Sequence, residues 1–308
     1  MPQRIHGVLP ILHTPFDAAD RIDLDTLKKE IDWAFEQGAD GIGTGMVSEI
    51  LRLTTDERAS LPAQLVEMAA GRGAVFMAVG AESTKQALAY AMLSERAGCD
   101  AVMCVPPLTT RLTEAALVDH FRAVAEGIDI PLIVQDASSY VGQAIPIDVY
   151  LKLLSKYGPE KILFKPEAPP NGPNISALRD ASDRRAQIFE GSGGVYAIDS
   201  FRRGVQGTMP GVDVLDGVAQ LWRAMERGDE PTAYRIYFPV CGIVTLQLQA
   251  GLDGFLAIEK YLMVKRGLFP SSRRRVPYWW TLDEETTAEL DRLFALLQLA
   301  LVTNGNGK

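Results

Sequence analysis

The chain has 308 residues, and its 39 Asp and Glu residues outnumber its 31 Lys and Arg residues, which gives a formal net charge of −8. This balance argues against a nucleic-acid-binding surface, which needs Lys and Arg clustered on one face. No apolar run reaches the roughly 18 residues needed to span a bilayer, and residues 1–17 lack the pattern of a secretory leader. We therefore expect a cytoplasmic protein with neither nucleic-acid nor membrane partners.

Short apolar runs alternate with longer amphipathic stretches along the first three quarters of the chain, a pattern typical of alternating strands and helices. The predicted strands lie at 7–12, 40–44, 74–80, 101–106, 131–137, 162–168, 186–191 and 207–211. The predicted helices lie at 23–38, from 54 onward, and at 83–98, 113–128, 145–158, 174–182, 196–204 and 215–228. Thr54 and Ser83 are expected N-caps, and Gly98 is an expected helix stop. Eight such pairs predict a closed barrel.

The strand runs are apolar throughout rather than alternating, which indicates burial on both faces, as in a parallel sheet covered by helices. A doubly wound open sheet is the rival, but its usual signs, a GxGxxG turn or a Walker loop, are missing from the sequence. We predict an α/β fold, a (β/α)8 barrel at 1–228, followed by a helical region at 229–308. That region contains expected helices at 230–249, 253–268 and 287–301.

Neither the cysteines nor the histidines follow a spacing typical of metal or disulfide chemistry. They are Cys99, Cys104, Cys241, His6, His13 and His120. No CxxC or CxxxH pattern occurs, and the histidines are scattered, so we expect no metal site and no disulfide. The one dense basic run, 273–275, adjoins serines and a proline and predicts a solvated loop or a subunit contact.

Lys165 is the most unusual residue of the predicted barrel, because it stands near the end of the sixth strand in an apolar setting. Active sites of such barrels lie at the C-terminal ends of the strands. Burial disfavours the ammonium form, and the neutral amine is the nucleophile that attacks a carbonyl. The alternative is a lysine that extends to the barrel mouth or pairs with Glu167.

Several spread-out motifs resemble the dihydrodipicolinate synthase and N-acetylneuraminate lyase family of Schiff-base aldolases. They are 14–17 (Thr-Pro-Phe-Asp), 38–41 (Gly-Ala-Asp-Gly), Ser48 with Glu49, Leu53, Glu57 with Arg58, Pro131, and Phe164 with Lys165. The resemblance implies that Lys165 forms a Schiff base with a small-molecule 2-oxo acid, without another cofactor. It also implies a homotetramer or a homodimer.

The chain departs from the family pattern at the positions that select the substrate. The fifth-strand tyrosine that relays protons is replaced by Gln135, and the tyrosine expected after the fourth strand is missing at 106–108. The arginine of dihydrodipicolinate synthase falls at about Tyr140. The acidic pair of the neuraminate lyases falls near 191–194, where Gly191 offers only backbone. Lysine biosynthesis is therefore disfavoured.

One branch of the family fits better, since 134–137 (Val-Gln-Asp-Ala) and 164–167 (Phe-Lys-Pro-Glu) resemble 2-keto-3-deoxy-L-arabonate dehydratase. We therefore expect a dehydratase of a 2-keto-3-deoxy sugar acid, with Lys165, Gln135 and Glu167 as catalytic residues. Glu167 shares the lysine's face only if the strand persists, and water or a substrate hydroxyl could serve as the base instead.

The expected substrate-binding residues surround the same strand ends. They are Val47, Ser48, Gly191 and Met209. Ser48 and the adjacent backbone N–H groups are expected to grip the substrate carboxylate, whereas Glu49 is expected to cap or pair behind the site, and Asp136 to be structural. Two other functions stay open: a pyruvate-dependent aldolase or dihydrodipicolinate synthase-type condensation, and a non-catalytic homologue that binds 2-oxo acids.

Overall fold

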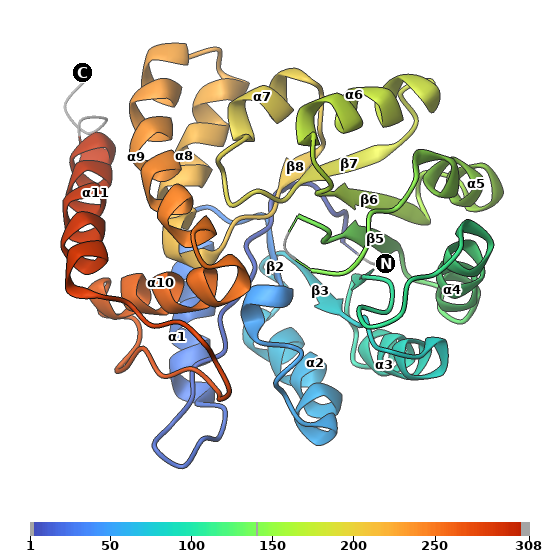
Figure 1. The fold of residues 1–308 in the computed structure, drawn as a ribbon, viewed down its shortest axis with the longest axis horizontal. Coiled ribbons are helices and arrows are strands. Elements are labelled where there is room, and N and C mark those ends of the chain that lie inside the picture. The colour runs from blue at the N-terminus through green and yellow to red at the C-terminus, as the bar shows by residue number, and fades with distance from the viewer. Residues whose placement is uncertain (1–2, 140, 303–308) are drawn as a thin grey trace.

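The computed structural model describes residues 3–139 and 141–302. Eight parallel strands form a barrel in the centre, and helices surround it (Figure 1). The strands are β1 (Gly7–Val8), β2 (Gly41–Gly43), β3 (Ala74–Ala78), β4 (Ala101–Cys104), β5 (Leu132–Asp136), β6 (Ile162–Pro166), β7 (Gln187–Glu190) and β8 (Gly207–Thr208). Sequential strands are neighbours, β8 pairs with β1, and a parallel bridge between Ile11 and Gly43 joins β1 to β2. The predicted (β/α)8 barrel is confirmed.

A helix follows every strand, as the alternation predicted. These helices are α1 (Leu24–Glu36), α2 (Thr55–Ala69), α3 (Thr84–Arg96), α4 (Glu114–Glu126), α5 (Ile147–Tyr157), α6 (Asn171–Ala181), α7 (Ala197–Arg202) and α8 (Leu215–Glu226). Thr54 caps α2 and forms a reciprocal pair of hydrogen bonds with Glu57, and Ser83 caps α3. Both predicted N-caps are confirmed. The short helices η1 (Met46–Ser48) and η2 (Val212–Val214) follow β2 and β8.

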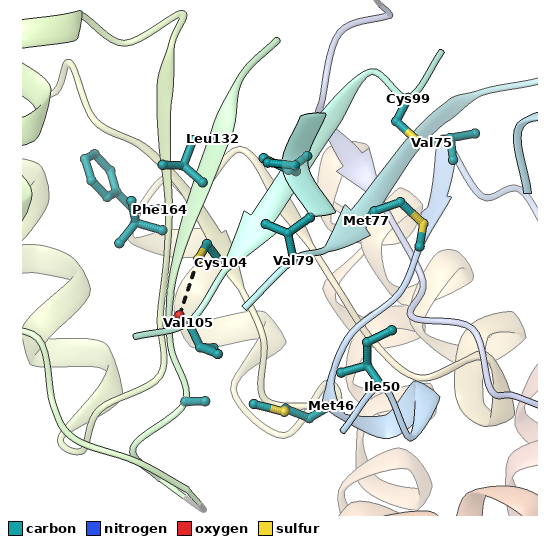
Figure 2. Close-up of a cluster of buried hydrophobic side chains, with 14 of the residues drawn as sticks. Met46, Ile50, Val75, Met77, Val79, Cys99, Cys104, Val105, Leu132 and Phe164 are labelled. Carbon is teal, nitrogen blue, oxygen red and sulfur yellow. Dashed lines mark hydrogen bonds between the residues drawn. The ribbon is translucent and has the colours of Figure 1, made fainter. Parts of the chain in front are cut away.

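Two apolar layers hold the barrel. The inner layer fills the barrel interior with large side chains such as Phe76, Met103 and Phe189. It requires a glycine at Gly43, since a Cβ there would lie 2.3 Å from the Phe76 ring. The outer layer lies between strands and helices, and Figure 2 shows part of it, including Val75, Met77 and Phe164. Burial on both faces explains why the strand runs are continuously apolar.

Three helices follow the barrel, close to the predicted ranges: α9 (Glu230–Leu248), α10 (Gly251–Lys265) and α11 (Glu284–Val302). Together with α8 they share an apolar core around Ile236, Val240 and Leu297. Helix α10 contacts η1 and η2, so it lies against the loops that follow β2 and β8. The division of the chain at residue 228 stays a prediction. Among the described residues, no helix combines the length and the apolar character that crossing a bilayer requires.

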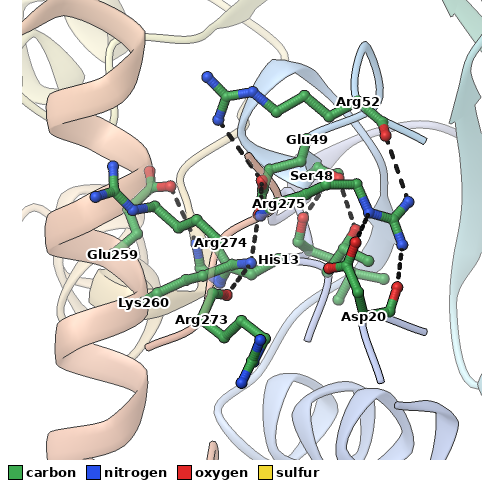
Figure 3. A network of polar contacts seen from close by, with 12 residues as sticks. His13, Asp20, Ser48, Glu49, Arg52, Glu259, Lys260, Arg273, Arg274 and Arg275 are labelled. Carbon is green, nitrogen blue, oxygen red and sulfur yellow. Dashed lines mark hydrogen bonds and ion pairs between the residues drawn. The ribbon is translucent and has the colours of Figure 1, made fainter. Parts of the chain in front are cut away.

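The basic run at 273–275 is not simply a solvated loop. Arg273 is exposed, but Arg275 is buried and its guanidinium pairs with Glu57 across the fold. Figure 3 shows that the backbone of the run also closes a polar network, since Arg275 N–H donates to Glu49 and Lys260 donates to Arg273 O. The prediction of a solvated loop was wrong for Arg275, because its side chain is buried in an ion pair with Glu57, a residue far away in the sequence.

Candidate active site

A small cavity of about 50 Å³ lies at the C-terminal ends of the barrel strands. Its lining includes Val47, Gln135, Lys165, Gly191, Met209 and Glu259. Five of these six residues were predicted as site residues, and the structure brings them together. Glu259, from α10, was not predicted.

Lys165 and Gln135 stand side by side because β5 and β6 pair in a register that sets Gln135 opposite Lys165. Lys165 is 3 % exposed, and its Nζ lies 3.0 Å from Oε2 of Glu167. The same Oε2 accepts a hydrogen bond of 2.8 Å from Nε2 of Gln135. The nucleophile and the amide of the cavity wall therefore share one carboxylate, which lies beside both of them.

The extended backbone continues past Pro166, because Glu167 N–H donates to Asp136 O at 3.0 Å. Residues two apart in an extended strand point to the same face, so the Glu167 side chain lies on the face of Lys165. Strand β6 itself ends at Pro166, so Glu167 reaches Lys165 from the first residue beyond the strand. Burial raises the pKa of Glu167, opposed by the charge of Lys165 and the Gln135 hydrogen bond. A carboxyl of this kind holds a proton more readily than an exposed one, which suits acid–base work.

Gly191 has no side chain, and this leaves room for the side chains of Lys165 and Glu167. A Cβ at this position would lie 2.5 Å from Cε and 2.6 Å from Nζ of Lys165, and 2.7 Å from Oε1 of Glu167. The glycine after β7 is therefore needed for the Lys165 and Glu167 side chains to lie side by side.

Ser48 lies behind the cavity wall, while its neighbour Val47 lines it. The Ser48 side chain is fully buried; its hydroxyl donates to Leu12 O and accepts from Gly45 N–H at 3.0 Å. These bonds fix the loop after β2 against the first strand. A direct grip of Ser48 on substrate stays a prediction, and the hydroxyl would have to leave Leu12 to make it.

Two carboxylates near the site have structural partners, as expected. Asp136 accepts hydrogen bonds from Ser138 N–H at 2.9 Å and from Ile145 N–H at 2.7 Å, which shape the loop after β5. Glu49 pairs with Lys260 of α10 behind the site (Figure 3). Tyr140, the position of the missing arginine, lies outside the described residues.

Sequence reasoning missed a buried cluster that borders the cavity. His13, Glu30, Asp213 and Glu259 come from four separate segments, and Nε2 of His13 lies 3.3 Å from Oε2 of Glu259. Sequence spacing gives no information on this cluster, since the partners of His13 come from across the fold. One signal was available: His13 and Asp213 follow neighbouring strands, β1 and β8, at the catalytic end of the barrel.

Comparison with known proteins agrees with this architecture. A family profile described as "Dihydrodipicolinate synthetase family" matches residues 4–295. The chain belongs to this family. It is thus an enzyme, either a hydro-lyase or an aldolase of the dihydrodipicolinate synthetase family.

Curated relatives of two different activities are similar to the chain. A 4-hydroxy-tetrahydrodipicolinate synthase of Methanosarcina mazei is 29 % identical over 242 residues, which are 77 % of this chain and 81 % of the relative. An L-2-keto-3-deoxyarabonate dehydratase of Azospirillum brasilense is 28 % identical over 295 residues, 93 % of each chain.

Solved structures of the family superpose along nearly the whole chain. The dihydrodipicolinate synthase of Rhodopseudomonas palustris has a TM-score of 0.84 at 26 % identity, covering 95 % of this chain and 98 % of that one. The 4-hydroxy-tetrahydrodipicolinate synthase of Methylacidiphilum fumariolicum has a TM-score of 0.88 at 22 % identity, covering 97 % and 98 %, and shows the shared fold.

Proposed function

We propose that this family member dehydrates a 2-keto-3-deoxy sugar acid through a Schiff base on Lys165. The observation that carries the proposal is the contact of buried Lys165 with Glu167, which also accepts from Gln135. An amine at the end of a barrel strand, with an acid–base group at 3.0 Å, is the minimum that this chemistry needs.

The reaction begins when Nζ of Lys165 attacks C2 of the substrate and water leaves, which gives an iminium. The iminium acidifies C3, Glu167 takes a C3 proton, and an enamine forms. The enamine expels the C4 hydroxyl, which takes the proton back from Glu167 and leaves as water. Tautomerisation and hydrolysis then free Lys165. Gln135 orients a hydroxyl or a water, because an amide side chain neither takes nor supplies a proton here.

A second cavity offers room for the hydroxylated end of such a substrate. It has a volume of about 360 Å³, and Gly191 and Phe255 line both cavities. Its polar lining includes Ser139, Ser192 and Asn171, whose Oδ1 is buried and has no hydrogen-bond partner among the described residues. The 2-oxo end of the substrate would lie at Lys165 and the hydroxylated end beyond Glu167.

A pyruvate-dependent aldolase or synthase-type condensation is the second candidate, favoured by the similarity to the synthase of M. mazei. It differs from dehydration in the bond that changes: condensation forms and aldol cleavage breaks C3–C4, whereas dehydration breaks C4–O. The amide of Gln135 weighs against it, because condensation calls for a proton relay on the fifth strand, which an amide cannot supply. A binding protein without turnover is disfavoured by the intact pair of Lys165 and Glu167.

The decisive test is borohydride trapping with pyruvate, read by intact mass and peptide mapping. The expected result is one reduced adduct on the peptide that contains Lys165, lost in Lys165→Met. Lys161→Met is the matched control, since Lys161 stands just before the opposite end of β6 and donates to Ile130 O. If no adduct forms between about pH 6 and pH 9, or if Lys165→Met still forms it, the Schiff-base proposal is wrong.

Product analysis separates the two reactions. Incubation with 2-keto-3-deoxy-L-arabonate is expected to give a product that has lost one water, with no signal from coupled lactate dehydrogenase. A lactate dehydrogenase signal would show release of pyruvate and would support the aldolase instead.

We also propose that the chain works in the cytoplasm as a homodimer or homotetramer. The supporting feature is an exposed apolar patch on α9 and α11, which contains Phe238, Leu296 and Leu299. Such patches often mark subunit interfaces. Analytical ultracentrifugation of the chain and of Phe238→Ser tests the assembly, and a monomeric chain contradicts it.

A further inference from the structure

Four ionisable side chains meet in the interior beside the catalytic cavity. His13 follows β1, Glu30 lies on α1, Asp213 lies in η2 and Glu259 lies on α10. All four are buried, with at most 2 % of any residue exposed. Figure 3 shows Glu259 on α10 next to Lys260, which is already paired with Glu49.

Three atoms of this cluster face one another without a hydrogen-bond partner among the described residues. They are Nε2 of His13, Oδ1 of Asp213 and Oε2 of Glu259. Nε2 lies 3.3 Å from the glutamate oxygen and 3.9 Å from the aspartate oxygen, and all three atoms lie within 4.8 Å of one another. Buried polar atoms are nearly always paired, and a buried uncompensated charge costs several kcal/mol. An occupant that satisfies all three atoms would remove this cost.

We propose that His13, Asp213 and Glu259 bind one divalent transition-metal ion, for which Zn²⁺ is the best-fitting probe. One imidazole nitrogen and two carboxylate oxygens are ligands that Zn²⁺ accepts. Metal–ligand bonds of about 2.0–2.2 Å in a tetrahedron place ligand atoms roughly 3.3–3.6 Å apart. Two of the observed separations, 3.3 and 3.9 Å, are close to this geometry, and the third pair of atoms, which lies within 4.8 Å, would close around the ion.

The groups behind the three ligands are also arranged for metal binding. Nδ1 of His13 lies 2.9 Å from Oε1 of Glu30. A metal-binding histidine commonly donates its second ring N–H to a carboxylate, which directs the lone pair of the other nitrogen to the metal. Gln247 donates to Oδ2 of Asp213 at 2.8 Å and turns Oδ1 inward. Gly211 keeps the space open, since a Cβ there would lie 2.4 Å from Oδ1 of Asp213.

The ion would sit in the wall of the cavity that contains Lys165, because Glu259 and Gly211 also line that cavity. With three protein ligands, a fourth position stays open for water or for an oxygen of a bound molecule. Binding of the metal does not depend on the Schiff-base proposal, which involves the opposite, β5–β6 side of the cavity.

A proton is the competing occupant of the cluster. Burial acts to lower the pKa of His13, but the carboxylates of Glu259 and Glu30, at 3.3 and 2.9 Å from the ring nitrogens, outweigh it and raise the pKa to about 10. Without a metal, His13 would therefore hold a proton between the carboxylates. The experiment has to distinguish the two occupants.

The test uses the full chain, stripped with EDTA and dialysed, and titrated with Zn²⁺ by calorimetry, with bound metal counted by mass spectrometry. We expect one Zn²⁺ per chain, and a Co²⁺ absorption spectrum typical of four-coordinate metal. Asp213→Asn and Glu259→Gln, which keep the side-chain shape, should each weaken binding at least about 100-fold. Glu30→Gln should weaken it about 10- to 100-fold through His13.

Asp253→Asn is the matched control, because Asp253 is a buried carboxylate on the same helix that pairs with Arg52 instead. It should bind Zn²⁺ like the parent chain, and circular dichroism should show that every variant is folded. Absence of stoichiometric Zn²⁺ in the parent chain, or equal binding by the parent and Glu259→Gln, would overturn the proposal and assign the cluster to proton sharing. Borohydride trapping at Lys165 is unaffected by either outcome, so the two proposals fail separately.

Discussion

Two groups of polar side chains lie at the cavity, and they are assembled in different ways. On one side, Gln135, Lys165 and Glu167 come from the paired strands β5 and β6. On the other side, the cluster of His13, Glu30, Asp213 and Glu259 comes from four elements spread along the chain. The β5–β6 group has donors and acceptors that satisfy one another, whereas three buried atoms of the His13 cluster have no hydrogen-bond partner in the part of the chain that the structure describes.

A single barrel can thus hold two sites with different chemistry beside one cavity. The β5–β6 group has a nucleophile and can carry covalent chemistry. Its polar groups already bind one another, so few of them are available as ligands for a metal ion. The His13 cluster has no amine or thiol, and its oxygen and nitrogen atoms are of the types that a divalent metal binds. Substitutions in either group test this division of roles.

The largest expected effect is that of Lys165→Met on turnover. Without the amine no iminium forms, so dehydration of 2-keto-3-deoxy-L-arabonate should fall by about 10⁴-fold or more, as for loss of a catalytic nucleophile. A continuous assay of the dehydrated product measures it, with Lys161→Met expected within about twofold of the parent. If Lys165→Met turned over within tenfold of the parent, covalent chemistry would not belong to the β5–β6 group.

Lys260→Met should give the next largest effect, on stability. The Lys260 ammonium is fully buried, pairs with Glu49 and stands 4.5 Å from the centre of the Phe16 ring. Removing one partner of a buried pair leaves the other charge uncompensated and costs about 3–5 kcal/mol. Urea unfolding measures the change, and we expect it to loosen α10, which carries Glu259.

Lys265→Met is the control, because Lys265 lies on the same helix, α10, and pairs with Asp291 at the surface. Exposed pairs contribute about 0–1 kcal/mol. Equal losses for the two variants would contradict the view that the Glu49 pair anchors α10 beside the cavity.

The sequence was sufficient for the barrel, because eight apolar runs predicted its strands. The roles expected of Lys165, Gln135 and Glu167 came chiefly from the resemblance to the family. The period of two put Lys165 and Glu167 on one face only on the condition that the sixth strand persisted. The register that sets Gln135 opposite Lys165 was learned from the structure.

The His13 cluster could not be derived in the same way. His13 and Asp213 could have been noticed as residues that follow adjacent strand ends, but Glu259 depends on where α10 packs after the barrel. The Ser48 hydroxyl donates to Leu12 O instead of to a ligand. This hydrogen bond likewise depends on the path of the loop after β2. The burial of Arg275 depends on its distant partner Glu57. Each of these features follows from tertiary packing, which local patterns do not contain.

Glu167→Gln tests the assignment of the proton transfers. The amide keeps the shape of the side chain but cannot carry the C3 proton, so kcat should fall by about 100-fold, while borohydride trapping with pyruvate should still label Lys165. Because burial raises the pKa of Glu167, the parent should lose the proton-accepting form as the pH falls through this raised value, and the acidic limb of its pH profile should be absent in the variant. Unchanged kcat would instead favour water or a substrate hydroxyl as the base.

Asp136→Asn should have the smallest effect, and it separates structure from chemistry within the β5–β6 group. Asp136 adjoins Gln135 in the strand, but its two oxygens accept from Ser138 N–H and Ile145 N–H in the following loop. An amide can accept from only one of them and turns its NH₂ toward the other, so thermal or urea unfolding should show a loss of about 1–3 kcal/mol in the free energy of unfolding.

Asp148→Asn, at an exposed position in the first turn of α5, is the control and should lose less than about 1 kcal/mol. Trapping at Lys165 should be retained in both variants, because neither carboxylate touches the lysine in the described contacts. If Asp136→Asn stayed folded and stable but no longer formed the adduct, Asp136 would act in the chemistry, and the catalytic group would extend to both faces of β5.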